Sequence, residues 1–222
     1  MGGRFAAILL YALLLANAAR AQPASPTPLN DIAGRPDSAA IQAVVGRGLL
    51  APKQPGVFDP TGAISRADFA AATQKLFALP PPAQPVWFAD VPPSSPNYAA
   101  IEAVAPYVMR ARAALCPTCM LSNSFGPQAT LPRIQAIALL TQALAGTGRV
   151  TLATPGESEA ALRGVAGVES LSAPGRQLVA TALASKVAAL GPNGTLDPGA
   201  PLDRANAAVL LNNAADVPPQ RP

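Results

Sequence analysis

The chain has 222 residues, of which 26 are proline and only 13% are charged, with 16 basic residues, 12 acidic residues and no histidine. The absence of histidine removes the commonest general base and metal ligand, and two cysteines alone cannot complete a structural zinc site. The small positive charge comes without a run of lysine and arginine and with few aromatic residues, which excludes the usual nucleic-acid-binding surfaces.

Residues 1–21 have the pattern of a secretory signal peptide. Arg4 precedes an apolar run from Phe5 to Ala18, and small residues lead to Gln22. The run is shorter than the roughly 20 residues that a bilayer-spanning helix needs, and no later stretch is long and apolar enough to span. We therefore expect an exported protein of the periplasm or cell surface, without a membrane span after cleavage.

A short cassette recurs three times in the rest of the chain, and each copy is followed, six residues after its proline, by an arginine. The cassettes are Gly56–Pro60, Ser124–Pro127 and Gly194–Pro198, and the arginines are Arg66, Arg133 and Arg204. The cassette prolines lie 67 and 71 residues apart. A fixed short spacing inside a long repeat indicates a duplicated structural unit.

Alanine-rich stretches interrupted by proline predict short helices joined by loops. In each of three segments we expect a first helix, the cassette loop, and a second helix that begins at the arginine. The predicted first helices are Ser38–Leu50, Tyr98–Leu115 and Pro174–Leu190. For the second helices, Ser65 and Asp203 are predicted N-caps. Pro132 stands at the equivalent place in the middle segment, so Thr130 is the predicted cap there.

The predicted organisation consists of three repeats with flexible ends and two linkers. Flexible ends are expected at 22–29 and 217–222, linkers at 81–85 and 147–159, and repeats at 30–80, 86–146 and 160–216. A lone helical hairpin of this size buries too little apolar surface to be stable. We therefore predict an all-α fold in which the three repeats pack on each other.

Cys116 and Cys119 fall within an insertion of the second repeat, because the first helix stands seven residues further from its cassette there than in the other two repeats. A C-x-x-C pair can be redox-active, but the strand-then-helix context of a thioredoxin-like unit is missing. We predict a local disulfide at 116–119 in an oxidising compartment, with a redox accessory role as the alternative.

Several of these stretches resemble the repeat of the S-layer homology family. Phe88–Pro92, followed by Tyr98 and Ile101, is similar to the family's F-x-D-V-P opening and its later aromatic and A-I. Gly56–Pro60 and Ile64–Asp68 are similar to the G-x-F-x-P and I-T-R-A-E signatures. Weaker versions occur at Leu29–Ile32 and Leu202–Asn206, so the resemblance covers nearly all of the chain after residue 21.

The resemblance implies a pseudo-threefold helical spindle that attaches an exported protein non-covalently to cell-wall polysaccharide or peptidoglycan. It also implies that Arg66, Arg133 and Arg204 bind an anionic glycan, since a guanidinium and the free N–H groups of a helix N-terminus both suit carboxylates. The alternative is that each arginine only caps a loop or pairs with a nearby aspartate. Repeats 2 and 3 depart from the signature, which favours the groove between repeats 1 and 2.

Trp87, the only tryptophan, either stacks on a sugar ring or closes the seam between two repeats. No Ser-His-Asp or Cys-His pair is possible, so we expect no enzyme, no metal and no cofactor. The predicted function is a non-catalytic envelope-binding module whose partner is a wall polysaccharide or peptidoglycan. The alternative is a periplasmic protein-interaction scaffold that has lost glycan binding and takes an envelope protein as its partner.

Overall fold

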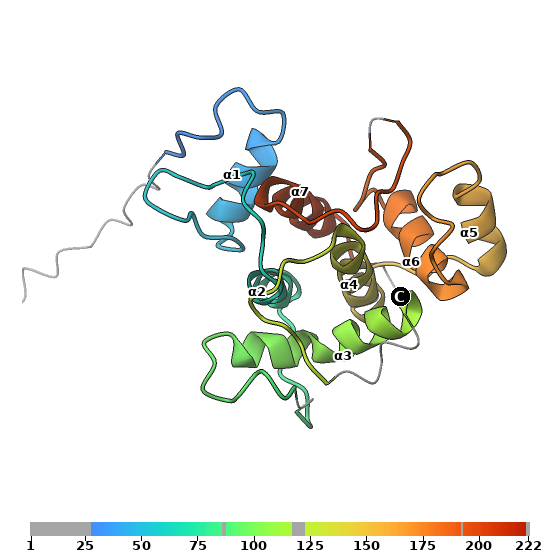
Figure 1. The fold of residues 1–222 in the computed structure, drawn as a ribbon, viewed down its shortest axis with the longest axis horizontal. Helices are drawn as coiled ribbons and strands as arrows, with labels where there is room; N and C mark the ends of the chain where they lie inside the picture. Colours follow the sequence, from blue (N-terminus) through green and yellow to red (C-terminus); the bar gives the residue numbers. More distant parts are fainter. Residues whose placement is uncertain (1–27, 86–87, 117–122, 192, 221–222) are drawn as a thin grey trace, which may run out of the picture.

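The structure is a computed structural model that describes residues 28–85, 88–116, 123–191 and 193–220, and these residues form seven α-helices and no β-strand (Figure 1). The helices are α1 (Ser38–Gly46), α2 (Arg66–Phe77), α3 (Tyr98–Leu115), α4 (Arg133–Gly146), α5 (Pro155–Ala161), α6 (Ala173–Ala184) and α7 (Arg204–Ala215). The predicted all-α fold class is confirmed.

The helix boundaries follow the sequence signals closely. The bounds of α3 are those predicted, and α2, α4 and α7 begin at the three arginines. Helix α1 ends earlier than predicted, at Gly46, because Gly48 adopts a φ of 65° and Leu49 N–H donates to Val44 O at 2.9 Å. This is the Schellman arrangement, in which a left-handed residue turns the chain out of the helix. Lys186, with a φ of 59°, follows the early end of α6 in a similar way.

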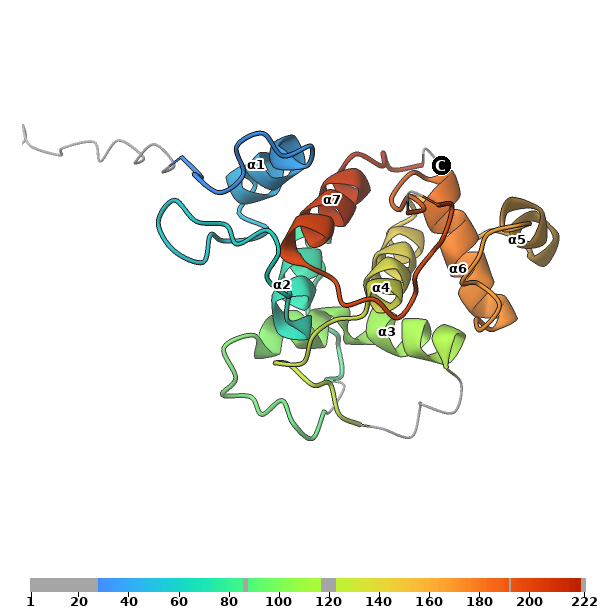
Figure 2. The same ribbon diagram turned by 45° about the horizontal axis from the view of Figure 1, so that its top comes forward.

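The three helices that begin at an arginine contact one another at the centre of the molecule (Figures 1 and 2). Each also packs against the first helix of another segment: α2 against α3, α4 against α6, and α7 against α1. Each pairing joins a segment to the next one, with the last returning to the first. The hydrophobic residue of every cassette is buried in this core, namely Phe58, Phe125 and Leu196.

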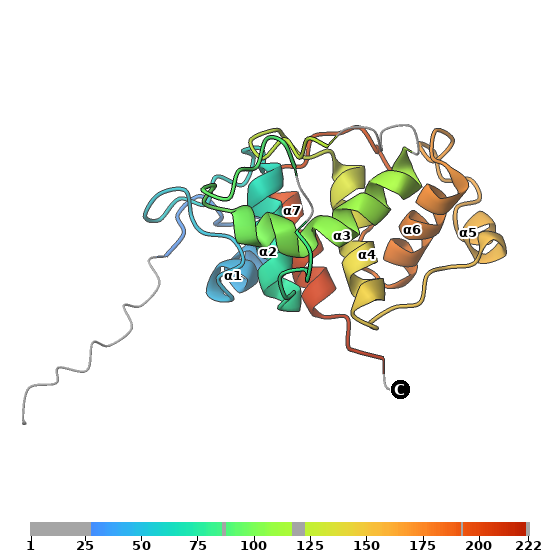
Figure 3. The ribbon, with the colours of Figure 1, turned by 90° about the horizontal axis from the view of Figure 1, so that it is seen from below.

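A closed ring of backbone hydrogen bonds joins the strips of chain that lead into the three inner helices. Ile64 N–H donates to Leu202 O at 3.1 Å, Leu202 N–H to Leu131 O at 2.8 Å, and Leu131 N–H to Ile64 O at 3.3 Å. All three side chains are buried. The loops before α4 and α7 run together along one edge of the molecule (Figure 3). The ring therefore gathers the N-terminal ends of α2, α4 and α7 in one region.

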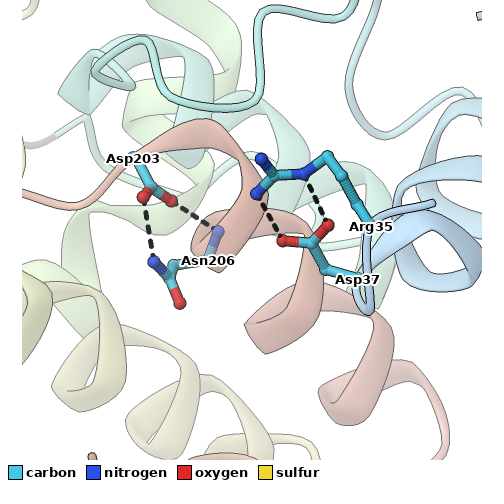
Figure 4. A network of polar contacts seen from close by, with 4 residues as sticks. All are labelled: Arg35, Asp37, Asp203 and Asn206. Atoms are coloured by element: carbon cyan, nitrogen blue, oxygen red, sulfur yellow. Dashed lines mark hydrogen bonds and ion pairs between the residues drawn. The ribbon is translucent and has the colours of Figure 1, made fainter. Parts of the chain in front are cut away.

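Two of the three predicted helix caps are confirmed. Ser65 Oγ accepts from Asp68 N–H at 3.0 Å, and Asp203 accepts from Asn206 N–H at 2.6 Å. Figure 4 shows the second cap beside the Arg35–Asp37 ion pair, whose closest N–O distance is 2.8 Å. The prediction that Thr130 caps α4 is wrong. The N-cap is Pro132, without a side-chain bond, because carbonyl groups of a neighbouring loop accept from the helix instead.

Two segments predicted to be linker or tail carry more structure than expected. The 147–159 stretch contains the start of α5, whose Thr154 and Glu157 form a reciprocal capping box and which packs on α6. Hydrophobic periodicity is too short there to reveal a helix of 7 residues. In the tail, Gln220 N–H donates to Gly148 O at 3.1 Å, and Arg149 donates to Val217 O. These bonds hold the chain against the end of α4 as far as Gln220.

Candidate functional site

The first N–H groups of α2, α4 and α7 are already occupied by backbone carbonyls from a cassette loop of another segment. The bonds are Arg66 to Ala129, Ala67 to Pro127, Arg133 to Ala200, Ile134 to Pro198, Arg204 to Gly62 and Ala205 to Pro60, with lengths of 2.9–3.4 Å. The third N–H is taken by a cap in α2 and α7 and by Pro132 O in α4. The expectation that free helix N–H groups help to hold an anion is therefore wrong. Charge recognition here falls to the guanidinium groups.

Arg204 lies in the interior and is only 2% exposed. Its Nε donates to Phe58 O at 2.8 Å, its Nη2 donates to Ala51 O at 2.7 Å, and its guanidinium carbon lies 4.5 Å from the centroid of the Phe58 ring. Burial lowers the pKa of Arg204, and the nearby carboxylates Asp68, Asp59 and Asp31 oppose that shift. The structure places this predicted ligand-binding residue where it joins α7 to the first segment.

Arg133 is partly buried at the edge of a cavity of about 460 Å³ between α7 and the loop that carries the third cassette. Its Nη2 donates to Ala189 O at 2.7 Å. Burial lowers the pKa of Arg133, while the carboxylates of Asp197 and Asp203 act in the opposite direction. Arg133 therefore reaches a cavity, but a backbone carbonyl and a nearby acid already engage its charge.

Arg66 differs from both. Its Nη1 donates to Phe125 O across a long 3.3 Å, and its Nε is buried without any hydrogen-bond partner. Burial lowers the pKa of Arg66, and Asp90 opposes the shift. A guanidinium stays protonated in proteins despite such pKa shifts. Its buried N–H group, which has no acceptor, would therefore be stabilised by a negatively charged or polarised atom placed next to it. Arg66 lines a cavity of about 420 Å³ between α2, α3, α4 and the second cassette.

Arg112, on the last turn of α3, lines the same cavity and was not singled out by the sequence reasoning. Its Nη2 donates to Ser124 O at 2.8 Å, and its guanidinium carbon lies 5.8 Å from the centroid of the Phe88 ring. Burial lowers the pKa of Arg112, and the positive charge of Arg66 lowers it further. Two like charges therefore share one pocket. The sequence feature that could have identified Arg112 as a site residue is its place shortly before the cysteines of the insertion.

The rest of the cavity wall is mainly apolar. Its described apolar lining comes from α2, α3, the loop before α4 and α4 itself: Phe69, Val108, Ala111, Leu115, Phe125, Ala129, Leu131 and Leu139. Ser124 and Gln135 add polar groups. A concave, mostly apolar pocket with a few convergent charged groups is the usual form of a small-ligand site.

Asp90, in the F-x-D-V-P stretch, positions the cassette that faces Arg66. Its carboxylate accepts from the N–H groups of Phe125 and Gly126 at 2.8 and 2.7 Å and from Ser124 Oγ at 2.8 Å. Asp31 does the same for the first cassette, accepting from the N–H groups of Phe58 and Asp59. The repeated aspartate was visible in the sequence, but its role follows only from the fold.

The arginines do not pair with the nearby aspartates, as one alternative held. The ion pairs found among the described residues are Arg35–Asp37 and Arg47–Asp216. Trp87 and Cys119 lie outside the described residues, so the sugar-stacking role and the disulfide stay predictions. Cys116 is the C-cap of α3 and lines the cavity.

In a comparison with known families, residues 28–70 match the family model of the S-layer homology domain. The matched region contains the first cassette and Arg66. No curated protein matches the chain. Among the described residues, no helix is long and apolar enough to cross a membrane, and no group of three or more potential ligands (His, Cys, Asp or Glu) is placed to hold a metal ion.

Proposed function

Because the chain contains an S-layer homology domain, a module that anchors proteins at the cell envelope, we propose that it is an exported, non-catalytic protein that attaches to a cell-wall polysaccharide or to peptidoglycan. The attachment uses an inter-repeat groove and involves no bond making or breaking. The proposed architecture is a pseudo-threefold body of three repeats, at 30–80, 86–146 and 160–216. The closed ring of hydrogen bonds through Ile64, Leu131 and Leu202 supports that symmetry.

The observation that carries this proposal is the state of Arg66. Its buried Nε has no acceptor, and the pocket beside it holds a second arginine. An anionic sugar or peptide carboxylate in this pocket gives the guanidinium the partner that the protein does not supply, and such charge-assisted hydrogen bonds are the strong ones. The bound glycan must present an anionic group to the groove.

Co-sedimentation with purified cell-wall sacculi tests the proposal. Wild-type protein should pellet with sacculi, and Arg66→Gln should bind at least about tenfold more weakly, because a hydrogen bond to a charged group contributes about 1.5–3 kcal/mol. Arg47→Gln is the matched control, since it removes one arginine charge from an exposed pair with Asp216, outside the pocket. Circular dichroism confirms that each variant is folded.

Equal pelleting of Arg66→Gln and wild type would show that this groove does not bind the wall. A protein that does not pellet at all would point to the second candidate, a periplasmic scaffold for an envelope protein. The withdrawal of Arg204 into the core and the engagement of Arg133 by a carbonyl favour that alternative, because they leave two grooves with little free charge.

A further inference from the structure

The loop of the third cassette carries a chemical motif that wall attachment does not use. Asn193 directly precedes Gly194, and no other asparagine of the chain is followed by glycine. The side-chain amide carbon of an asparagine can be attacked by the backbone nitrogen of the next residue, which closes a succinimide ring. Glycine at that next position favours ring closure, because it has no side chain to obstruct the approach and has the widest backbone freedom.

The structure leaves this pair of residues accessible. Asn193 and Gly194 are both exposed, and Gly194 has a φ of 68°. A Cβ atom built on Gly194 would meet nothing within 4 Å beyond its chain neighbours, so a ring and a water molecule have room there. Gly194 N–H donates to Gly191 O at 2.9 Å, and Gly191 N–H donates to Thr195 O at 2.8 Å. The attacking nitrogen is therefore released by opening one hydrogen bond of an exposed loop, and local openings of this kind need little free energy.

The other asparagines that the structure describes are less suited to this reaction. Those in α7 are Asn206, Asn212 and Asn213. In a helix the following N–H group points along the axis to a carbonyl four residues earlier, which keeps its nitrogen away from the side-chain amide carbon. The remaining described asparagines are each followed by a residue with a side chain that obstructs the attack: Asn30 by Asp31, Asn97 by Tyr98 and Asn123 by Ser124. The combination of glycine, exposure and a short loop occurs at Asn193.

We propose that the exposed Asn193–Gly194 pair is a site of spontaneous deamidation and isomerisation, with water as the co-reactant. Gly194 N bonds to Asn193 Cγ, and the side-chain amide leaves as ammonia with the proton that the nitrogen gives up. Water then breaks one of the two ring C–N bonds that involve this nitrogen. Cleavage at Cγ gives aspartate, and cleavage at the main-chain carbonyl carbon gives isoaspartate, whose main chain runs through the side-chain carbons. Nothing is oxidised or reduced.

Both products alter the loop that holds Arg133. Each adds a carboxylate to the loop in which Ala189 O accepts from Arg133 Nη2. Isoaspartate also adds one atom to the main chain between Gly191 and Thr195, where the two hydrogen bonds close the loop. We therefore expect the isoaspartate form to lose these bonds and to be less stable. The chemistry is independent of wall attachment, so its tests do not bear on the proposed function.

Incubation of the purified protein at mildly alkaline pH, followed by peptide mapping with mass spectrometry, tests the site. The peptide that contains Asn193 should gain the mass of an –NH2 to –OH exchange at least about tenfold faster than the peptides that contain Asn97 or Asn123. An isoaspartate-specific methyltransferase should label the same peptide. The rate in the folded protein should lie within about threefold of the rate in guanidinium chloride, because the loop is exposed. Faster deamidation at another asparagine, or a folded rate far below the unfolded one, would overturn the assignment.

Two variants separate the roles of glycine and of the lengthened main chain. Gly194→Asp should slow deamidation of Asn193 at least about tenfold, and Asp59 and Asp197 show that aspartate adopts a positive φ in this protein. Freshly purified Asn193→Asp carries the carboxylate of one product without the added main-chain atom. Wild-type protein aged until isoaspartate predominates should therefore melt at a lower temperature than Asn193→Asp. Equal deamidation rates in Gly194→Asp and wild type, or equal melting of the aged protein and Asn193→Asp, would contradict the proposal.

Discussion

Replacing Arg204 by methionine should destabilise the protein strongly, although methionine is apolar and of similar length. Arg204 donates to Phe58 O and Ala51 O from a site that is 2% exposed, and its guanidinium lies over the Phe58 ring. The substitution leaves two carbonyls without that donor. Hydrogen bonds from a charged group contribute about 1.5–3 kcal/mol each, and the buried methionine side chain returns part of the loss. We expect a net cost of about 3 kcal/mol.

Arg66→Met is the matched control, because Arg66 is also the first residue of an inner helix. It makes one long 3.3 Å bond and leaves Nε buried without a partner, so its removal should cost about 0–1 kcal/mol. Urea denaturation followed by circular dichroism measures both variants. With a slope near 2 kcal/mol per molar urea, the two midpoints should differ by about 1 M or more.

Equal midpoints for the two methionine variants would refute the assignment of Arg204 to the core. A second readout separates structure from binding: folded Arg204→Met should still pellet with sacculi as wild type does, at temperatures well below its midpoint. Selective loss of pelleting in a folded Arg204→Met protein would return Arg204 to the ligand-binding set that the sequence predicted.

Two further predictions concern the caps and the aspartates that hold the cassettes. Ser65→Ala should lower the free energy of unfolding by about 1 kcal/mol in urea, since Ser65 alone accepts from Asp68 N–H, whereas Thr130→Ala should change it little because Thr130 does not cap α4. Burial alone would raise the pKa of Asp90, but bonds from Phe125, Gly126 and Ser124 lower it overall, and Asp31 behaves in the same way with Phe58 and Asp59. Because these carboxyl pKa values are lower in the folded than in the unfolded state, their contribution to stability is complete above the unfolded pKa near 3.8 and is lost as the pH falls through the lower folded values. Asp90→Asn should therefore reduce stability at pH 6 and flatten its fall below pH 4, and a thermal melt series across pH 2–7 that shows the same acid slope for variant and wild type would contradict this.

Local signals in the sequence were enough to predict the three inner helices that begin at an arginine. Proline and alanine patterns located the inner helices, and the cassette spacing placed an arginine at the first residue of each. Ser65 and Asp203 caps act within three residues, so they are readable from the sequence alone. Helix α5 was not predicted, because its 7 residues make only about two turns, which show no periodicity of their own, and it depends on packing against α6.

The three arginines hold equivalent positions in the sequence, but their surroundings in the folded protein differ. From the chain alone, Arg66, Arg133 and Arg204 are equivalent, since each follows its cassette proline by the same interval. Whether a guanidinium is free depends on acceptors that lie 56 to 153 residues away along the chain. Such contacts are set when loops from different segments meet, and no local pattern records them.

The sequence by itself therefore determined the helical class, the repeated cassette and the positions of the arginines, because helix propensity, capping and turn chemistry act over a few residues. Tertiary structure alone decided which arginine is buried in the core, which is tied to a loop carbonyl, and which faces a pocket with Arg112. Burial and hydrogen bonding are properties of groups that folding brings together. The structural effect of the seven-residue insertion therefore depends on how α3 packs against α2, which the sequence alone does not show.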